Sequence, residues 1–245
     1  MIRSRTFHFK DSNFRIRSDR FDQAIAAIQA QRALLESYIE KHPAFAGSMV
    51  PVGLLPDAPN IARRMAHAAS QTGVGPMAAV AGTIAQLAAE AALAAGASEA
   101  IVENGGDLYV AAPRETRVAL YAGHSPIGDS LAFAIPPERL PLAICSSSSR
   151  MGHSLSLGDC DLATVVATNA SLADAAATLA ANLVKTPDDI DPTLARIQAI
   201  PGIAGVLLVK GERIGLAGDL PPLVRNTDPA SRHKITRDPR AEPLP

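Results

Sequence analysis

Four short segments of the chain carry residue types and spacings that can do chemistry, and the first lies near residue 170. Asp174 and Thr178 are four residues apart, so on a helix they share one face. A carboxylate and a hydroxyl oxygen form a suitable partial shell for Mg²⁺, which keeps waters and binds substrate phosphates. The alternative is structural, because Ser171 as an N-cap with Asp174 three residues later resembles a capping box. The sequence alone leaves both interpretations open.

The second segment follows a predicted strand and consists of Asn104, Gly105, Gly106 and Asp107. The two glycines permit positive φ and a close approach of the backbone to a ligand, and the two polar residues flank that approach. The alternative is an ordinary hairpin turn. The segment therefore predicts either a turn that lines a binding site or a turn alone.

The third segment is a serine run that leaves another predicted strand. Cys145 or a serine, together with His153, would supply a nucleophile and a base, and the hydroxyl groups would bind phosphate. The run itself comprises Ser146, Ser147, Ser148 and Ser149, followed by Arg150. A solvated loop with a structural histidine is the alternative. No third member of a catalytic triad is identified.

The fourth segment places Gly75 and Pro76 at the N-cap and first positions of a predicted helix. The free N–H groups and the dipole at such an end favour an anion such as phosphate, so Gly75 is a predicted cofactor-binding position. Gly73 and Gly75 also begin a pattern like that of dinucleotide-binding loops. The segment before them is predicted to be helical, however, where that pattern requires a strand. The alternative is that glycine and proline only punctuate the helix.

The pattern of apolar residues predicts the elements that must position these segments. A hairpin over residues 3–17 turns at residues 11–13, and a helix runs from an N-cap at Asp19 to residue 41. Further helices are predicted at 61–70, 77–95 and 171–184, and strands at 100–103, 108–111, 116–122, 129–134, 142–145, 162–167, 205–209 and 213–216. This order indicates an α+β fold. We expect one domain over residues 1–225 and a flexible tail over 226–245.

The composition excludes several classes of protein. The chain has 245 residues, with 23 Lys and Arg against 24 Asp and Glu, and only 4% are aromatic, which argues against nucleic-acid binding. The uncharged stretch 65–89 contains His, Gln, Gly and Pro, so we interpret it as a buried segment and expect no contact with a membrane. Two cysteines are too few for a disulfide framework, and the N-terminus lacks the pattern of a signal peptide. These features predict a cytoplasmic protein.

Taken together and in order, the Asn-Gly-Gly-Asp segment and the Ala-Asp-Ala-Ala-Ala-Thr segment at 173–178 resemble the ApbE-like superfamily of flavin transferases. That superfamily carries a Gly-Gly-acid turn after a strand and later an Ala-Asp-Ala-x-x-Thr helix start. The resemblance is closest to a short, uncharacterised branch of the superfamily. In that branch a Gly-Pro-Met-Ala-Ala-Val-Ala-Gly stretch and a Cys-x-Ser-Ser…Gly-His-Ser segment recur, here at 75–82 and 145–154.

The resemblance implies an α+β fold in which mixed or antiparallel sheets pack with Ala-rich helices. It implies that Asp174, Thr178 and the carbonyl of Ala79 hold Mg²⁺ beside the pyrophosphate of FAD. Characterised members cleave FAD and attach FMN to a Thr or Ser of an acceptor protein, so FAD or FMN and an acceptor protein are the implied ligand and partner. A homodimer is the expected assembly. The residues implied to line the flavin nucleotide pocket are Asn104, Gly105, Gly106, Asp107, Ser146, Ser147 and Ser148.

The chain also departs from the characterised enzymes. His153 precedes Ser-Leu-Ser-Leu-Gly-Asp where those enzymes have Ile-Ile-Asp-Pro-Arg-Thr-Gly, and Ala81 stands where they have an acidic residue. Two alternatives to a flavin enzyme therefore stay open. One is an enzyme of cofactor or one-carbon metabolism acting on another phosphorylated or pterin-like molecule, and the other is a non-catalytic binding or assembly protein. For an enzyme, the predicted catalytic residues are Asp174, His153 and Cys145.

Overall fold

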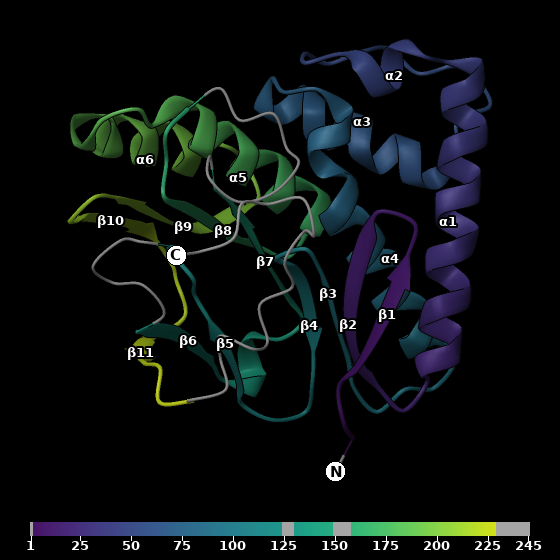
Figure 1. Ribbon diagram of the computed structural model, residues 1–245, viewed down its shortest axis with the longest axis horizontal. Helices are drawn as coiled ribbons and strands as arrows, with labels where there is room; N and C mark the ends of the chain where they lie inside the picture. The colour runs from purple at the N-terminus through teal and green to yellow at the C-terminus, as the bar shows by residue number, and fades with distance from the viewer. Residues whose placement is uncertain (1, 124–129, 149–157, 229–245) are drawn as a thin grey trace.

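The computed structural model describes residues 2–123, 130–148 and 158–228, and its central element is an eight-stranded sheet (Figure 1). The strand order is β1-β2-β3-β4-β7-β8-β9-β10, and every neighbouring pair is antiparallel. The strands are β1 (Arg5–Phe9), β2 (Ser12–Ser18), β3 (Ala100–Asn104), β4 (Asp107–Ala111), β7 (Leu142–Ser147), β8 (Leu162–Ala167), β9 (Ile203–Lys210) and β10 (Arg213–Gly218).

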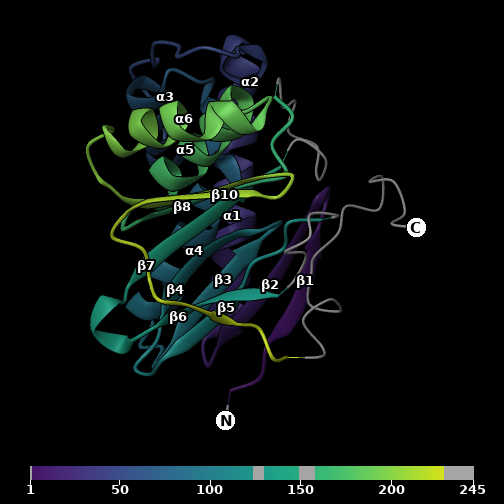
Figure 2. The same ribbon diagram turned by 90° about the vertical axis from the view of Figure 1, so that its left-hand side faces the viewer.

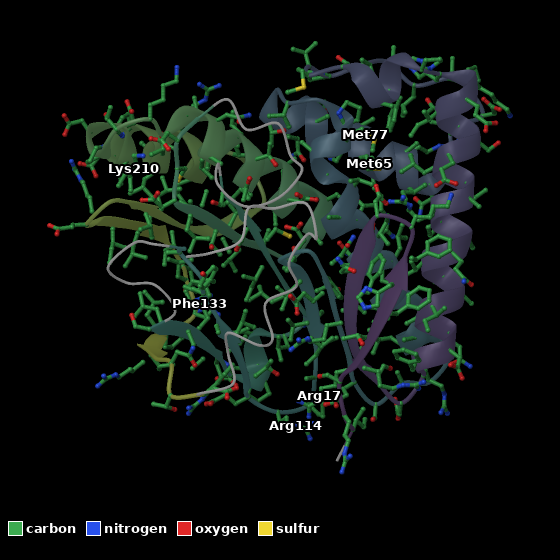
Figure 3. The ribbon with its side chains drawn as sticks, viewed as in Figure 1. Arg17, Met65, Met77, Arg114, Phe133 and Lys210 are labelled. Carbon is green, nitrogen blue, oxygen red and sulfur yellow. The ribbon has the colours of Figure 1, made fainter. Side chains whose placement is uncertain are left out.

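A second, three-stranded antiparallel sheet has the order β11-β6-β5. Its strands are β5 (Thr116–Ala119), β6 (Leu131–Ile135) and β11 (Leu223–Arg225). Phe133 on β6 is fully buried against apolar residues of β4, β7, β8 and β9, so the two sheets share one hydrophobic core (Figures 2 and 3).

Helices cover the other face of the large sheet. They are α1 (Phe21–Lys41), α2 (Ala44–Gly47), α3 (Asn60–Thr72), α4 (Val80–Ala94), α5 (Ala170–Leu183) and α6 (Ile190–Gln198), with a 3₁₀ turn, η1 (Pro76–Ala79), before α4. Helix α4 packs on β3 and β4, α5 on β7 and β8, and α6 on β9 and β10, while α1 and α3 lie outside α4 and α5 (Figures 1 and 2). Alanine dominates the buried faces of α4 and α5, which lets both helices lie close to the sheet and to each other. The predicted α+β class with antiparallel sheets and Ala-rich helices is confirmed.

One described helix, the continuous stretch Pro76–Ala94, is long and apolar enough to cross a membrane by length and composition. More than half of that stretch is buried inside the protein, where it packs between the large sheet and α1, α3 and α5. Core helices pass the same test of length and composition. Its place in the core agrees with the buried segment expected from the sequence.

Two local predictions at the ends of elements are wrong, and one helix was not predicted. The first hairpin turns at Lys10 and Asp11 rather than at residues 11–13, and Lys10 takes the positive φ that this tight turn requires. Asp19 does not cap α1, whose N-cap is Arg20, because the Asp19 carboxylate instead accepts hydrogen bonds from the backbone N–H and the hydroxyl of Ser98. Helix α6 was not expected, although Ile190, Leu194 and Ile197 recur at helical spacing and are buried.

The predicted domain boundary at residue 225 coincides with the last residue of β11. Residues 229–245 lie outside the described part of the chain, so the flexible tail stays a prediction.

Candidate functional site

The N-terminal ends of α4 and α5 meet at a glycine. Gly82 N–H donates a hydrogen bond to Asp174 Oδ2 at 2.8 Å, and the hydroxyls of Thr83 and Ser171 are hydrogen-bonded at 2.7 Å. A Cβ on Gly82 would lie 2.5 Å from the carbonyl oxygen of Ala170 and 2.9 Å from Asp174 Cβ. The two helices therefore cross at a distance that only glycine permits.

Asp174 caps the neighbouring helix rather than its own. The N-cap position of α4 is Ala79, which has no polar side chain, so the N–H of Gly82 in the first turn takes its acceptor from α5. The N-cap of α5 is Asn169, whose Oδ1 accepts a hydrogen bond from Leu172 N–H at 3.0 Å. The capping-box interpretation of Ser171 and Asp174 is therefore wrong. The N-terminal end of α4, which was predicted to attract a phosphate, faces the carboxylate of Asp174. The helix dipole favours a carboxylate at this end.

The Asn-Gly-Gly-Asp segment forms a two-residue hairpin turn that also positions polar side chains. Gly105 and Gly106 have φ of 64° and 110°, and Asn104 pairs directly with Asp107 across the strands. Both polar side chains are buried on the face that α4 covers, and Asn104 Nδ2 donates to the carbonyl of Ala81 at 3.2 Å. The turn thus fixes Asp107 beneath the start of α4.

Asp107 is a buried acid with an unpaired oxygen. Its side chain is 7% exposed, and its Oδ1 has no hydrogen-bond partner among the described residues. Burial raises the pKa of Asp107 to about 7, opposed by the thiol of Cys145 and the N–H of Ser146. Burial, and next the charge of Asp107, raise the pKa of Asp174 well above its usual value, opposed by the N–H groups of Gly82 and Ala81. The two carboxyl groups, named here the acid pair, are stable together when a proton or a cation reduces their charge.

In protein free of metal ions, the free energy of unfolding is expected to fall as the pH rises from about 4 to about 7. Asp107 ionises near pH 3.8 when unfolded and near pH 7 when folded, so the folded state binds more protons in this window. Each such proton makes stability fall by about 1.4 kcal/mol per pH unit. Asp107→Asn is expected to reduce this slope, measured by urea unfolding across the window in EDTA. An unchanged slope in that variant contradicts the assignment.

Cys145 lies beside the acid pair as a buried thiol. Its side chain is fully buried, and its Sγ donates to the carbonyl of Ala170 at 3.6 Å. Burial, followed by the charges of Asp107 and Asp174, raises the pKa of this thiol well above its usual value. A protonated, inaccessible thiol is a poor nucleophile, so these properties favour a structural role over the predicted catalytic one.

The serine run divides between the two faces of the sheet. Strand β7 extends through Ser147, so neighbouring side chains alternate. Ser146 is hydrogen-bonded at 2.9 Å to the hydroxyl of Thr164, its cross-strand partner, on the face away from Cys145. Ser147 lies on the face of Cys145, and both Ser147 and Ser148 are buried. Ser149, Arg150 and His153 lie outside the described residues.

The remaining predicted residues lie around η1. Gly75 is the N-cap of η1 with Pro76 at N1, as predicted, but the backbone of Ser48 lies against it and covers this position. The carbonyl of Ala79 accepts a hydrogen bond from Thr83 Oγ1. Thr178 is partly exposed one turn beyond Asp174, on the helix that packs against η1.

Sequence reasoning missed Gly82, Thr83 and Gln86, which join α4 to α5. Gln86 Oε1 accepts a hydrogen bond from Ala170 N–H at 2.8 Å. The signal that could have found Thr83 and Gln86 is a polar side chain within a helix of otherwise mostly apolar residues, whereas Gly82 carries no such signal. Within the described residues no group of three or more His, Cys, Asp or Glu side chains could hold a metal ion.

Comparisons with known proteins agree with the motifs and the fold. The family model described as AbpE bacteria matches residues 3–201. A UPF0280 protein of Methanococcus maripaludis is 40% identical over 223 residues, which cover 88% of this chain and 90% of that protein. A UPF0280 protein of Methanocella arvoryzae is 41% identical over 194 residues, covering 79% of each chain.

Solved structures share the fold at low sequence identity. The flavin transferase ApbE from Vibrio cholerae has a TM-score of 0.58 and 12% identity, covering 89% of this chain and 97% of that one. The flavinyl transferase ApbE of Pseudomonas stutzeri, in its apo form, has a TM-score of 0.56 and 12% identity, covering 89% and 95%. The chain belongs to the AbpE bacteria family and is a UPF0280 member of the ApbE-like superfamily.

Proposed function

We propose that the chain binds a flavin nucleotide, FAD or FMN, together with Mg²⁺ at the acid pair, and that it transfers FMN from FAD to an acceptor protein. The observation that carries the proposal is Asp107 Oδ1, a buried acceptor without a partner among the described residues, in the same site as Asp174. The fold shared with structures described as flavin transferases supports the choice of ligand.

The chemistry of the donors fits Mg²⁺. This ion is typically held by one or two carboxylates and completes its shell with waters and substrate phosphates. Asp174 and Asp107 would supply the carboxylates and Thr178 a hydroxyl, whereas the carbonyl of Ala79 already accepts a hydrogen bond from Thr83. Bound there, Mg²⁺ would neutralise charge on a pyrophosphate and on a departing phosphate group.

Residues of the hairpin and of β7 would hold the nucleotide. Gly105 is exposed and has no side chain, so a ligand can approach its backbone closely. Asn104 joins the hairpin to the start of α4 through the carbonyl of Ala81, so both walls of this site form one unit. Ser147 and Ser148 would add hydroxyl donors, and His153 is the proposed base for the acceptor hydroxyl.

The same proposal covers location and assembly. Cys145 and Cys160 are both buried, and among the described residues neither forms a disulfide, which supports a reducing, cytoplasmic compartment. An acceptor protein and a homodimer are the proposed partners.

The test is to incubate the purified protein with FAD and MgCl₂, with and without candidate acceptors, and to measure AMP and FMN by chromatography. We expect AMP release that requires Mg²⁺ and stops in EDTA. Asp57→Asn is the matched control for an Asp174→Asn variant in this assay, because it makes the same chemical change at an exposed loop residue. If the protein binds no flavin and releases no AMP in the presence of Mg²⁺, the proposal is contradicted.

Binding without turnover is the second candidate function. The observation that favours it is that Asp174 Oδ2 already accepts a hydrogen bond from Gly82, so the residue also has a structural task. FAD retained at one molecule per chain, with no AMP on prolonged incubation with acceptors, is the result that would select this candidate.

A further inference from the structure

Helices α4 and α5 cap each other. The first N–H of α5, that of Ala170, donates to Gln86 Oε1 on α4, and the first-turn N–H of Gly82 on α4 donates to Asp174 Oδ2 on α5. Ala170 and Asp174 are four residues apart, so both lie on the side of α5 that faces α4. Each helix therefore supplies an acceptor that the start of the other lacks.

Gln86 is held at both ends of its amide. Its Nε2 donates to Glu90 Oε1 at 2.9 Å, and both carboxylate oxygens of Glu90 accept from Arg64 of α3, at 2.9 and 2.8 Å. A flipped amide would point NH₂ at the N–H of Ala170 and an oxygen at the carboxylate of Glu90, so one orientation is fixed. Gln86 is only 9% exposed, and burying its amide is favourable because both ends are bonded.

We propose that Gln86 is a positioning residue for the acid pair. Gln86 accepts the hydrogen bond of the first N–H of α5 and so sets where α5 starts along α4. Asp174 lies one turn later on α5, and this placement brings it within hydrogen-bond distance of Gly82 N–H and beside Asp107. The chain of contacts from Arg64 through Glu90 to Gln86 extends this control to α3. The link to ligand binding rests on the proposed function, whereas the positioning of Asp174 does not.

The test compares Gln86→Leu with a double exchange, Gln86→Glu with Glu90→Gln. The leucine removes both hydrogen bonds of the amide at similar volume. In this double variant, the carboxylate at position 86 still accepts from Ala170 N–H, and the amide at position 90 can donate back to it. The two hydrogen bonds of position 86 are therefore restored, while position 90 keeps one acceptor oxygen for Arg64 instead of two. Phe133→Leu is the control for lost stability, because it lies in the core on the other side of the large sheet (Figure 3).

The first measurement is hydrogen exchange of the Gly82 amide by NMR, which reports its bond to Asp174 directly. Gln86→Leu is expected to speed this exchange by about tenfold, beyond the effect of its lost global stability. The double variant, Gln86→Glu with Glu90→Gln, is expected to return hydrogen exchange of the Gly82 amide to near the wild-type rate. Phe133→Leu is expected to change that rate only as far as its lower global stability requires. An unchanged rate of hydrogen exchange at Gly82 N–H in Gln86→Leu overturns the proposal. If Gln86→Leu does not fold, the proposal is overturned when the double variant fails to protect Gly82 N–H from exchange.

The second measurement is the dissociation constant for FAD in the presence of MgCl₂. Gln86→Leu is expected to weaken binding by about tenfold, with recovery in the double variant. If wild-type protein binds no FAD, the proposed function fails, and the Gly82 amide still decides whether Gln86 positions Asp174. If FAD affinity is unchanged in Gln86→Leu while wild-type protein binds FAD, the role of Gln86 at the acid pair is overturned.

Discussion

Asp174→Asn is expected to weaken Mg²⁺-dependent binding of FAD by about a hundredfold or more. Asparagine has the shape of aspartate, and its Oδ1 can still accept the hydrogen bond of Gly82 N–H, so the cap of α4 is kept. What is lost is the negative charge that a cation requires. The measurement is a titration of FAD at fixed MgCl₂, with Asp57→Asn as the control that should match wild type.

The stabilities of two variants at Asp174 distinguish its structural role, as acceptor for Gly82 N–H of α4, from its proposed role as a metal ligand. Asp174→Asn is expected to be at least as stable as wild type in EDTA at neutral pH, by on the order of 1 kcal/mol. Burial beside Asp107 makes the carboxyl group either take up a proton on folding or carry a buried charge, and asparagine does neither. Asp174→Ala leaves Gly82 N–H without its acceptor and is expected to lose about 1–3 kcal/mol. Wild-type FAD affinity in Asp174→Asn would contradict a metal at this residue.

Gly82→Ala is expected to destabilise the protein by about 2–3 kcal/mol, measured by urea unfolding. In a helix, glycine to alanine alone stabilises by roughly 1 kcal/mol, so propensity favours the substitution. The added Cβ, however, would lie 2.5 Å from the backbone oxygen of Ala170, and a backbone atom cannot move aside as a side chain can. The clash therefore outweighs propensity, and separation of the helices would also displace Asp174.

Gly47→Ala is the matched control for this prediction. Gly47 lies in the short helix α2, and a Cβ there would have no atom within 4 Å. The same change is therefore expected to be neutral or slightly stabilising. A Gly82→Ala protein as stable as Gly47→Ala would show that α4 and α5 do not cross as closely as described.

The sequence predicted most elements of the fold because their apolar periods are local. The helix predicted at 77–95, the strand predicted at 100–103 and the turn after it all follow from residues within a few positions, and the structure has η1 with α4 at 76–94 and β3 at 100–104. The same local rules explain the error at α5. Ser171 and Asp174 have the spacing of a capping box, but Asn169 is also a good N-cap and lies two residues earlier.

The contacts that build the site were beyond local rules. Gly82 and Asp174 are separated by 92 positions, and Gln86 and Ala170 by 84, so no pattern within an element indicates that they meet. The serine run shows the same limit in a strand. With β7 predicted to end at Cys145, the alternation that turns Ser146 away from the acid pair could not be applied.

The most direct test of the central claim is a crystal structure of the protein with FAD and Mn²⁺, which replaces Mg²⁺ among oxygen ligands and is located by its anomalous scattering. We predict one Mn²⁺ site with Asp174 and Asp107 as ligands and with phosphate oxygens of the nucleotide completing its shell. Mn²⁺ and FAD bound elsewhere, with Asp107 Oδ1 still unpaired and Asp174 bonded only to the start of α4, would contradict the claim.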